Sequence, residues 1–437
     1  MAPGGKRLVL LSFDGISLRH FQALLDWMPK LKDIVADLAC ARLNSRPFTA
    51  ASPLWAQLLT GKPWDENGCI GYAQPQHSLN KVEIVTEKDL SVPVLPLYKE
   101  RRGAVINVPI LLPFENRAWL SDGSLPIQLP VMPASLAESE PFSTYQARAF
   151  DSLPYAAAMP KLSTPRCLET EENRLQCAAK LARDPGYQWL IVRLSIFDEL
   201  AHFYGDAWLD EPQMWFREML EEFCRRADDL IDEICAHATV YVLSCFSHCR
   251  CKSTANLNLI LKQKEFLQLY QERSQSRTEG RRAEAIEAIT GAQIRKDRLQ
   301  SVAGQLVASK TLAASPVTGC IYVNEASVFA DGCVSEAQLK PLIRDMAEYL
   351  KSETKRKFVG KTEFYVPSAH CAIKPRPECI VWIDDTLLTD ALDPPSADSR
   401  AGSMHVPDGF VYGASISDDA LQPSSLHLVG QIIGRSM

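Results

Sequence analysis

The 437-residue chain has no apolar run that approaches the roughly 18 residues needed for a membrane-spanning helix. Basic residues are not in excess, because 47 Lys and Arg stand against 53 Asp and Glu and give a formal net charge of −6. Nucleic-acid-binding proteins, by contrast, usually present a basic face. No internal repeat or low-complexity tract is present. These absences predict a globular protein that binds neither a membrane nor nucleic acid.

The N-terminal residues MAPGGKRLVLLSFDG lack a signal-peptide cleavage region, and their short apolar run is typical of a first buried strand. The thirteen cysteines are an odd number scattered among apolar residues, which suits reduced thiols better than a disulfide framework. Together these features predict a cytoplasmic protein. One short segment, CFSHCRC at residues 245–251, gathers several soft metal ligands.

Short β-rich runs alternate with amphipathic helical stretches along the chain. This pattern is typical of an α/β fold, with a mostly parallel central sheet and helices on both faces. The length exceeds the roughly 100 to 200 residues of one ordinary domain, so we expect one large domain, 1–437, that carries insertions. Residues 75–165, rich in proline, are expected to form an inserted cap. Residues 262–315, highly charged, are expected to form a solvated helical excursion rather than a binding arm.

Candidate functional residues follow the predicted strands, where the functional groups of open α/β sheets gather. Asp14 ends the first strand, and Asp198 ends the later strand YQWLIVRLSIFD. Asp198 and His202 are four residues apart, so a helix would put both on one face, within reach of one metal ion. An N-capping Asp beside an unrelated His explains the same spacing. His405, in the loop GSMHVPDGF, is by itself either a ligand or an ordinary solvated residue.

The stretch FTAASPLWAQLLTG, residues 48–61, is expected to enter a buried helix. Ser52 is the expected N-cap, Pro53 the first helical residue, and Gly61 lies just past the end. Thr49 and Ser52 place hydroxyl groups beside the start of this helix.

Several segments occur in the same order as in the type I phosphodiesterase/nucleotide pyrophosphatase family of the alkaline phosphatase superfamily. The chain resembles this family over residues 7–415, through the segments LLSFDG, SPLWAQLLTGKPWDENGCIGY, SIFDELAHFYG, TVYVLS with STANLNLILKQKEFL, TGCIYVNEASVFADGCVSEAQLKPLIRDM and GSMHVPDGF. The resemblance implies an alkaline-phosphatase-like fold and phosphoryl-transfer chemistry at two zinc-type ions.

The resemblance also implies the ligands of each ion. Asp198, His202 and His405 match all three ligands of one site, whereas Asp14 alone matches the other. The family has a nucleophilic Thr or Ser where this chain has Ala51. Its metal-binding Asp and His, in the motif SDHG, are replaced by Cys245 and Phe246. The remaining candidates are therefore Ser52 or Thr49 as nucleophile, and Cys245 or His248 as compensating ligand.

Two hypotheses follow from this selective loss. In the first, the chain is an enzyme that holds one divalent ion, zinc, through Asp198, His202 and His405, while Asp14 acts as a base. It would act as a hydrolase or a related transferase on a small phosphate ester, diester or related ester, without a covalent Thr/Ser intermediate. In the second, it is an inactive relative that binds a phosphorylated ligand or a protein partner. An inactivating substitution at Ala51 alone does not explain the changes at residues 245 and 246.

Overall fold

The computed structural model describes most of the chain, namely residues 6–48, 50–123, 130–147, 160–204, 214–250, 253–268, 306–317, 319–358, 360–367, 375–384, 386–389, 403–416 and 426–435. The chain divides into two compact units. The core unit comprises Met1–Asn67, Thr86–Cys249 and His405–Met437, and the second unit comprises Gly68–Val85 and Arg250–Met404.

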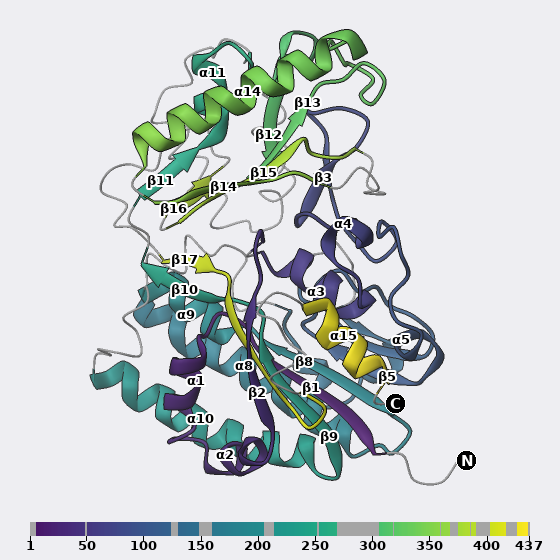
Figure 1. Cartoon of the computed structure of the whole chain (residues 1–437). Helices are drawn as coiled ribbons and strands as arrows, with labels where there is room; N and C mark the ends of the chain where they lie inside the picture. Colours follow the sequence, from purple (N-terminus) through teal and green to yellow (C-terminus); the bar gives the residue numbers. More distant parts are fainter. Residues whose placement is uncertain are drawn as a thin grey trace. The chain divides into compact units, whose positions relative to one another are not determined.

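The core unit is built on an eight-stranded, mostly parallel sheet (Figure 1). Strands β9, β1, β8, β5 and β6 are parallel neighbours, whereas β18 is antiparallel to β9 and β2, and β7 is antiparallel to β6. In their order across the sheet, the strands are β2 (Ala39–Asn44), β18 (Asp408–Gly413), β9 (Ala238–Ser244), β1 (Arg7–Phe13), β8 (Trp189–Leu194), β5 (Gly103–Ile106), β6 (Arg117–Leu120) and β7 (Val131–Met132). The predicted α/β class is confirmed.

The apolar run of β1 explains its central place, because a parallel strand is buried on both faces. Val9, Leu11 and Phe13 point to one face and join the main hydrophobic cluster. That cluster also contains residues from five helices: α1 (Leu18–Leu24), α2 (Pro29–Ala36), α8 (Pro160–Ala182), α9 (Ile196–Tyr204) and α10 (Met214–Cys235). Figure 1 shows these helices together around the lower part of the sheet.

Two further helices of the core unit, α3 (Ala51–Thr60) and α15 (Leu426–Arg435), pack on each other. Their close approach depends on Gly430, since a Cβ there would lie 2.2 Å from the carbonyl oxygen of Leu58. The shorter helices of this unit are α4 (Trp64–Asn67), α5 (Leu97–Glu100), α6 (Ala134–Ala137) and η1 (Phe142–Thr144). None of the described helices is both long and apolar enough to cross a bilayer.

The second unit is a smaller α/β body. Its four-stranded antiparallel sheet has the order β12 (Ala313–Val317), β13 (Cys320–Val323), β15 (Cys379–Ile383) and β14 (Thr362–Tyr365). The remaining elements are β3 (Ala73–Pro75), β4 (Val82–Ile84), β11 (Ser253–Asn256), α11 (Leu257–Gln263), η3 (Ala308–Lys310), α14 (Glu336–Lys357) and β16 (Thr386–Thr389). Helix α14 begins with a capping box formed by Ser335 and Gln338.

Two segments expected as insertions have different places in the structure. Residues 75–165, the expected cap, include β5, β6 and β7 of the central sheet. A capping role for the rest of that segment stays a prediction. Most of the expected helical excursion, residues 269–305, lies outside the described residues. All eleven described cysteines are free thiols, as their scattered positions predicted.

The start of α3 differs from the prediction. Its N-cap is Ala50, which makes no side-chain cap hydrogen bond, and the helix begins at Ala51. Ser52 is therefore the second helical residue and not the cap. Pro53 is tolerated one position further on, because the first N–H groups of a helix have no intrahelical partner. The other end is as predicted, with Gly61 in the left-handed conformation at φ 63°.

Candidate metal centre

The carboxyl ends of three neighbouring strands meet at the candidate site. Because β1 runs parallel to both β8 and β9, the residues that follow them lie at one edge of the sheet. Asp14 follows β1, and Asp198 lies in the first turn of α9, directly after β8. Gly15 makes this approach possible: its φ is +94°, and a Cβ there would lie 2.5 Å from the backbone N of Asp198.

Four side chains converge on one point of the core unit. The ligand atoms of Asp198, His202, His248 and His405 all lie within 4.8 Å of one another. Asp198 Oδ1 is 2.8 Å from His248 Nε2, 2.9 Å from His405 Nε2 and 3.4 Å from His202 Nε2. The two strands that carry His248 and His405, β10 (Ser247–Arg250) and β17 (Ser403–Val406), form a two-stranded sheet. Among the described residues, this is the group of His, Cys, Asp and Glu side chains placed to hold a metal ion.

Burial differs among the four members. The His248 side chain is 2% exposed, whereas that of His202 is 33% exposed and that of His405 is 23% exposed. The three imidazole rings surround the carboxylate, with His202 edge-on to His248 at a centroid distance of 4.8 Å. His248 is therefore the buried histidine of the group, whereas the side chains of His202 and His405 are accessible to solvent.

The electrostatics of the group suit metal binding. Burial opposes ionisation of Asp198, but the charge of His405 and hydrogen bonds from the three imidazoles hold its pKa well below the usual range. Burial lowers the pKa of His248 to about 3, and the neighbouring His405 contributes in the same direction. Burial likewise opposes protonation of His202, but Asp198 raises its pKa. Near neutral pH the group offers an ionised carboxylate and a neutral His248, the forms that bind metal ions.

Asp14 does not join this group. Its buried carboxylate accepts four hydrogen bonds: from Ser12 Oγ at 2.7 Å, the Cys245 backbone N–H at 3.1 Å, Trp55 Nε1 at 2.9 Å and Arg193 Nε at 2.7 Å. The bond from Arg193 is a buried ion pair. Asp14 is thus satisfied by protein donors at both oxygens.

The other predicted site residues are not members of the metal group. Cys245 is fully buried, and burial together with the nearby Asp14 charge raises the pKa of its thiol well above the ordinary value. A protonated thiol is a poor ligand. Phe246 is also buried, and its ring packs on that of His405 at a centroid distance of 4.4 Å. Ser52 is buried within α3. Thr49 lies outside the described residues.

Two residues of this region were not recognised from the sequence in these roles. His248 was expected, if anywhere, at the second ion's place, but the structure brings it into the group of Asp198, His202 and His405. Arg193 is not among the residues predicted for the site. The sequence nevertheless indicates a paired arginine, because a charge inside the apolar run WLIVRL of a buried strand requires a partner.

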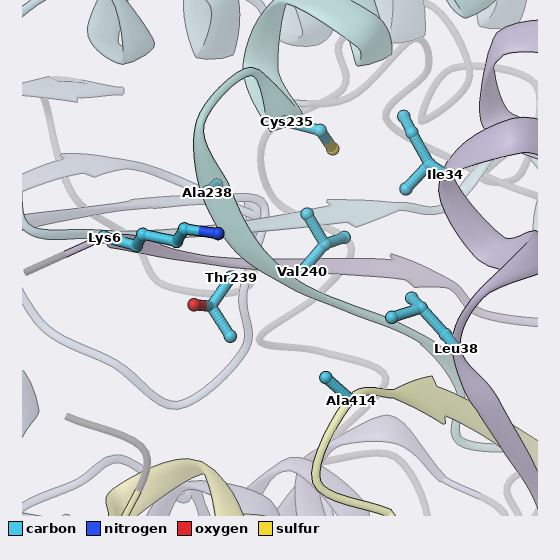
Figure 2. A pocket seen from close by; sticks show the side chains of 8 residues that line it. All are labelled: Lys6, Ile34, Leu38, Cys235, Ala238, Thr239, Val240 and Ala414. Atoms are coloured by element: carbon cyan, nitrogen blue, oxygen red, sulfur yellow. The ribbon is translucent and has the colours of Figure 1, made fainter.

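A separate pocket lies at the opposite end of the strands. It has a volume of about 330 Å³ and is lined by residues before β1, at the start of β9 and after β18 (Figure 2). Its lining is Lys6, Ile34, Leu38, Cys235, Ala238, Thr239, Val240 and Ala414. The pocket contains none of the predicted site residues, and functional groups in such sheets lie at the carboxyl ends.

Comparison with known proteins finds no matching family model and no matching curated sequence. Solved structures, however, match nearly the whole chain. A phosphonoacetate hydrolase from Sinorhizobium meliloti 1021, in complex with phosphonoacetate, is 14% identical with a TM-score of 0.56, and the match covers 99% of this chain and 96% of that one. A variant of the alkaline phosphatase PafA is 13% identical with a TM-score of 0.52, over 96% and 93% of the two chains.

A murine ectonucleotide pyrophosphatase/phosphodiesterase 5, in an inactive form with AMP, matches over 93% of this chain and 88% of its own, at 10% identity and a TM-score of 0.48. At such low identities, similarity establishes the fold. The chain has the fold of the alkaline phosphatase superfamily, and the resemblance read from its sequence is confirmed at that level.

Proposed function

We propose that the protein binds one divalent metal ion through Asp198, His202, His248 and His405 and hydrolyses a small phosphate ester, diester or related ester. The convergence of four ligand atoms within 4.8 Å carries this proposal. Three imidazoles and one carboxylate are a donor set that suits zinc, the metal we propose. When bound, such an ion acts as a Lewis acid toward a phosphoryl or carbonyl oxygen.

The chain's own residues limit the kind of reaction. Ala51 offers no nucleophile, and Ser52 is buried in the second position of α3. We therefore propose hydrolysis without a covalent Thr/Ser intermediate. Asp14 pairs with Arg193, so we assign it a supporting electrostatic role in place of the base suggested by the sequence.

The substrate class is proposed from chemistry and from fold relatives. Exposure of His202 and His405 leaves the metal group open to a solvent-borne molecule. The structurally similar hydrolase was solved with phosphonoacetate, a small phosphonate. A small molecule with a phosphoryl or phosphonyl group is therefore the substrate class we propose.

A second candidate function has a specific observation in its favour. His248 adds a fourth protein ligand, and four protein ligands close a tetrahedral zinc site in the manner of structural centres. Under this alternative, the protein binds a phosphorylated ligand or a protein partner without turnover. The missing hydroxyl at Ala51 favours the same alternative.

Metal analysis combined with turnover assays tests the two candidates. Under the proposed function, purified protein carries about one zinc ion per chain and hydrolyses aryl phosphate esters, aryl phosphodiesters or phosphonates. His202→Ala should abolish both properties. His77→Ala, at an exposed histidine outside the metal group, is the matched control and should change neither.

Three outcomes separate the readings. One bound ion with turnover that depends on His202 supports the enzyme. One bound ion with no turnover on any of the three substrate types supports the alternative. Absence of a bound ion after purification in zinc-containing buffer refutes the metal assignment in both.

A further inference from the structure

Arg193 occupies an unusual position between two acids. It is a charged residue within the apolar strand β8, and its side chain is only 10% exposed. Its Nε donates to Asp14 Oδ2 at 2.7 Å, and its Nη2 lies 3.7 Å from Asp198 Oδ2. The opposite oxygen of Asp198 faces the three imidazoles. The guanidinium therefore links Asp14 to the carboxylate of the metal group.

The residues around Asp14 do not fit a second ion. A divalent ion needs several ligands, and Asp14 already accepts four hydrogen bonds from protein donors. The residues at the positions of the metal-binding Asp and His of the similar family are Cys245, a buried thiol, and Phe246, whose ring has no donor atom. A positive charge is nevertheless present, because Arg193 supplies it.

We propose that Arg193 is a built-in substitute for a second metal ion: it neutralises Asp14 and orients Asp198, so that the centre binds a single ion. This inference rests on the proposed function. It adds that the metal site holds one ion and that Arg193 is a positioning residue for Asp198. Partners that hold a metal-ligating carboxylate typically affect metal affinity by about 10- to 100-fold. Arg193 is such a partner by charge, because its Nη2 forms an ion pair with Asp198 Oδ2 at 3.7 Å.

The test measures metal binding in five purified proteins, with zinc analysis for stoichiometry and a chromophoric chelator for affinity. The wild type should bind one ion, and Asp14→Asn should still bind one. Arg193→Gln should also bind one ion, but about 10- to 100-fold more weakly. Arg117→Gln is the matched control, because Arg117 is another buried arginine, which lies on β6 and forms an ion pair with Glu87. It should leave zinc affinity unchanged even if it destabilises the fold.

The fifth protein, His202→Ala, separates failure of this inference from failure of the proposed function. If His202→Ala keeps its ion, the proposed metal site is wrong. Two ions in the wild type, with one lost in Asp14→Asn, would overturn the inference while leaving the proposed function intact. Wild-type zinc affinity in Arg193→Gln would also overturn it.

Unfolding measurements keep the inference testable if a variant folds poorly or no ion binds. Asp14→Asn and Arg193→Gln each remove one charge of the buried Asp14–Arg193 pair and keep the other, whereas the double variant removes both charges. The double variant should therefore be more stable than the two single effects predict by at least about tenfold in the folding equilibrium constant. Additive effects would mean that the two side chains do not act as a pair and would reject the role of Arg193.

Discussion

Replacing His248 by alanine tests the four-ligand centre most directly, because this residue is absent from the three-ligand set expected from the sequence. His248 Nε2 lies 2.8 Å from Asp198 Oδ1, and its side chain is 2% exposed. Structural zinc sites bind with about 10 to 16 kcal/mol of free energy, so one ligand of four contributes about 2.5 to 4 kcal/mol. We expect His248→Ala to weaken zinc binding by about a hundredfold or more.

The same loss can be read from thermal stability. At a free zinc concentration of 100 times the wild-type Kd, the ion stabilises the fold by about 2.7 kcal/mol. A hundredfold weaker site at that concentration is half filled and is stabilised by only about 0.4 kcal/mol. The assay is a pair of unfolding curves for each protein, with zinc and with chelator. The zinc-dependent shift should nearly vanish in His248→Ala.

The control is His77→Ala, which removes an exposed histidine and should keep the full zinc-dependent shift. Chelator-treated samples measure any damage to the apo fold separately from the loss of binding. If His248→Ala keeps the wild-type zinc affinity, His248 is not a ligand, and the centre returns to the set of Asp198, His202 and His405.

Three further changes have defined outcomes. Gly15→Ala should destabilise the fold by at least about 2 kcal/mol, because the φ of Gly15 is +94° and the new Cβ would lie 2.5 Å from backbone atoms of Asp198. Denaturant titrations measure this loss, and an unchanged unfolding midpoint would contradict the packing described. Trp55→Phe removes a hydrogen bond to the buried Asp14 carboxylate and should cost about 1.5 to 3 kcal/mol by the same measurement. Ser52→Ala should keep the wild-type rate in the aryl ester assays; a large loss would restore Ser52 as a candidate nucleophile.

The central sheet could be predicted because its strands are apolar runs that are visible in the sequence. The apolar runs of β1, β8 and β9 require burial on both faces, and parallel packing provides it. The pairing of Asp198 with His202 could be predicted as well, since helical spacing alone puts the two on one face. Only the family resemblance assigned His405 to the same site as this pair, because His405 lies 203 residues from His202 in the chain.

The roles of His248 and Arg193 could not be read from the sequence for different reasons. His248 lies on β10, which pairs with β17, the strand of His405, and these two segments are far apart in the chain. The burial of Arg193 predicts that its charge is paired. Its partners, Asp14 and Asp198, could not be predicted, because they depend on the order of the strands. The predicted start of α3 is wrong because Ser52 is a good N-cap residue by type, whereas the N-cap is Ala50, two residues earlier.

Under the role proposed for Arg193, the differences between this chain and the family that its sequence resembles are explained as one coupled change. An isolated carboxylate at the position of Asp14, fully buried, would be strongly destabilising without a cation. Arg193 supplies that cation from within the fold, so the chain does not require an ion there. A guanidinium has no open coordination position with which to activate a neighbouring hydroxyl. Ala51 lies one helical turn before Trp55, on the face of α3 that meets Asp14. If Arg193 replaces a second metal ion, as we propose, a hydroxyl at residue 51 would have no ion to activate it, and Ala51 is consistent with the same replacement.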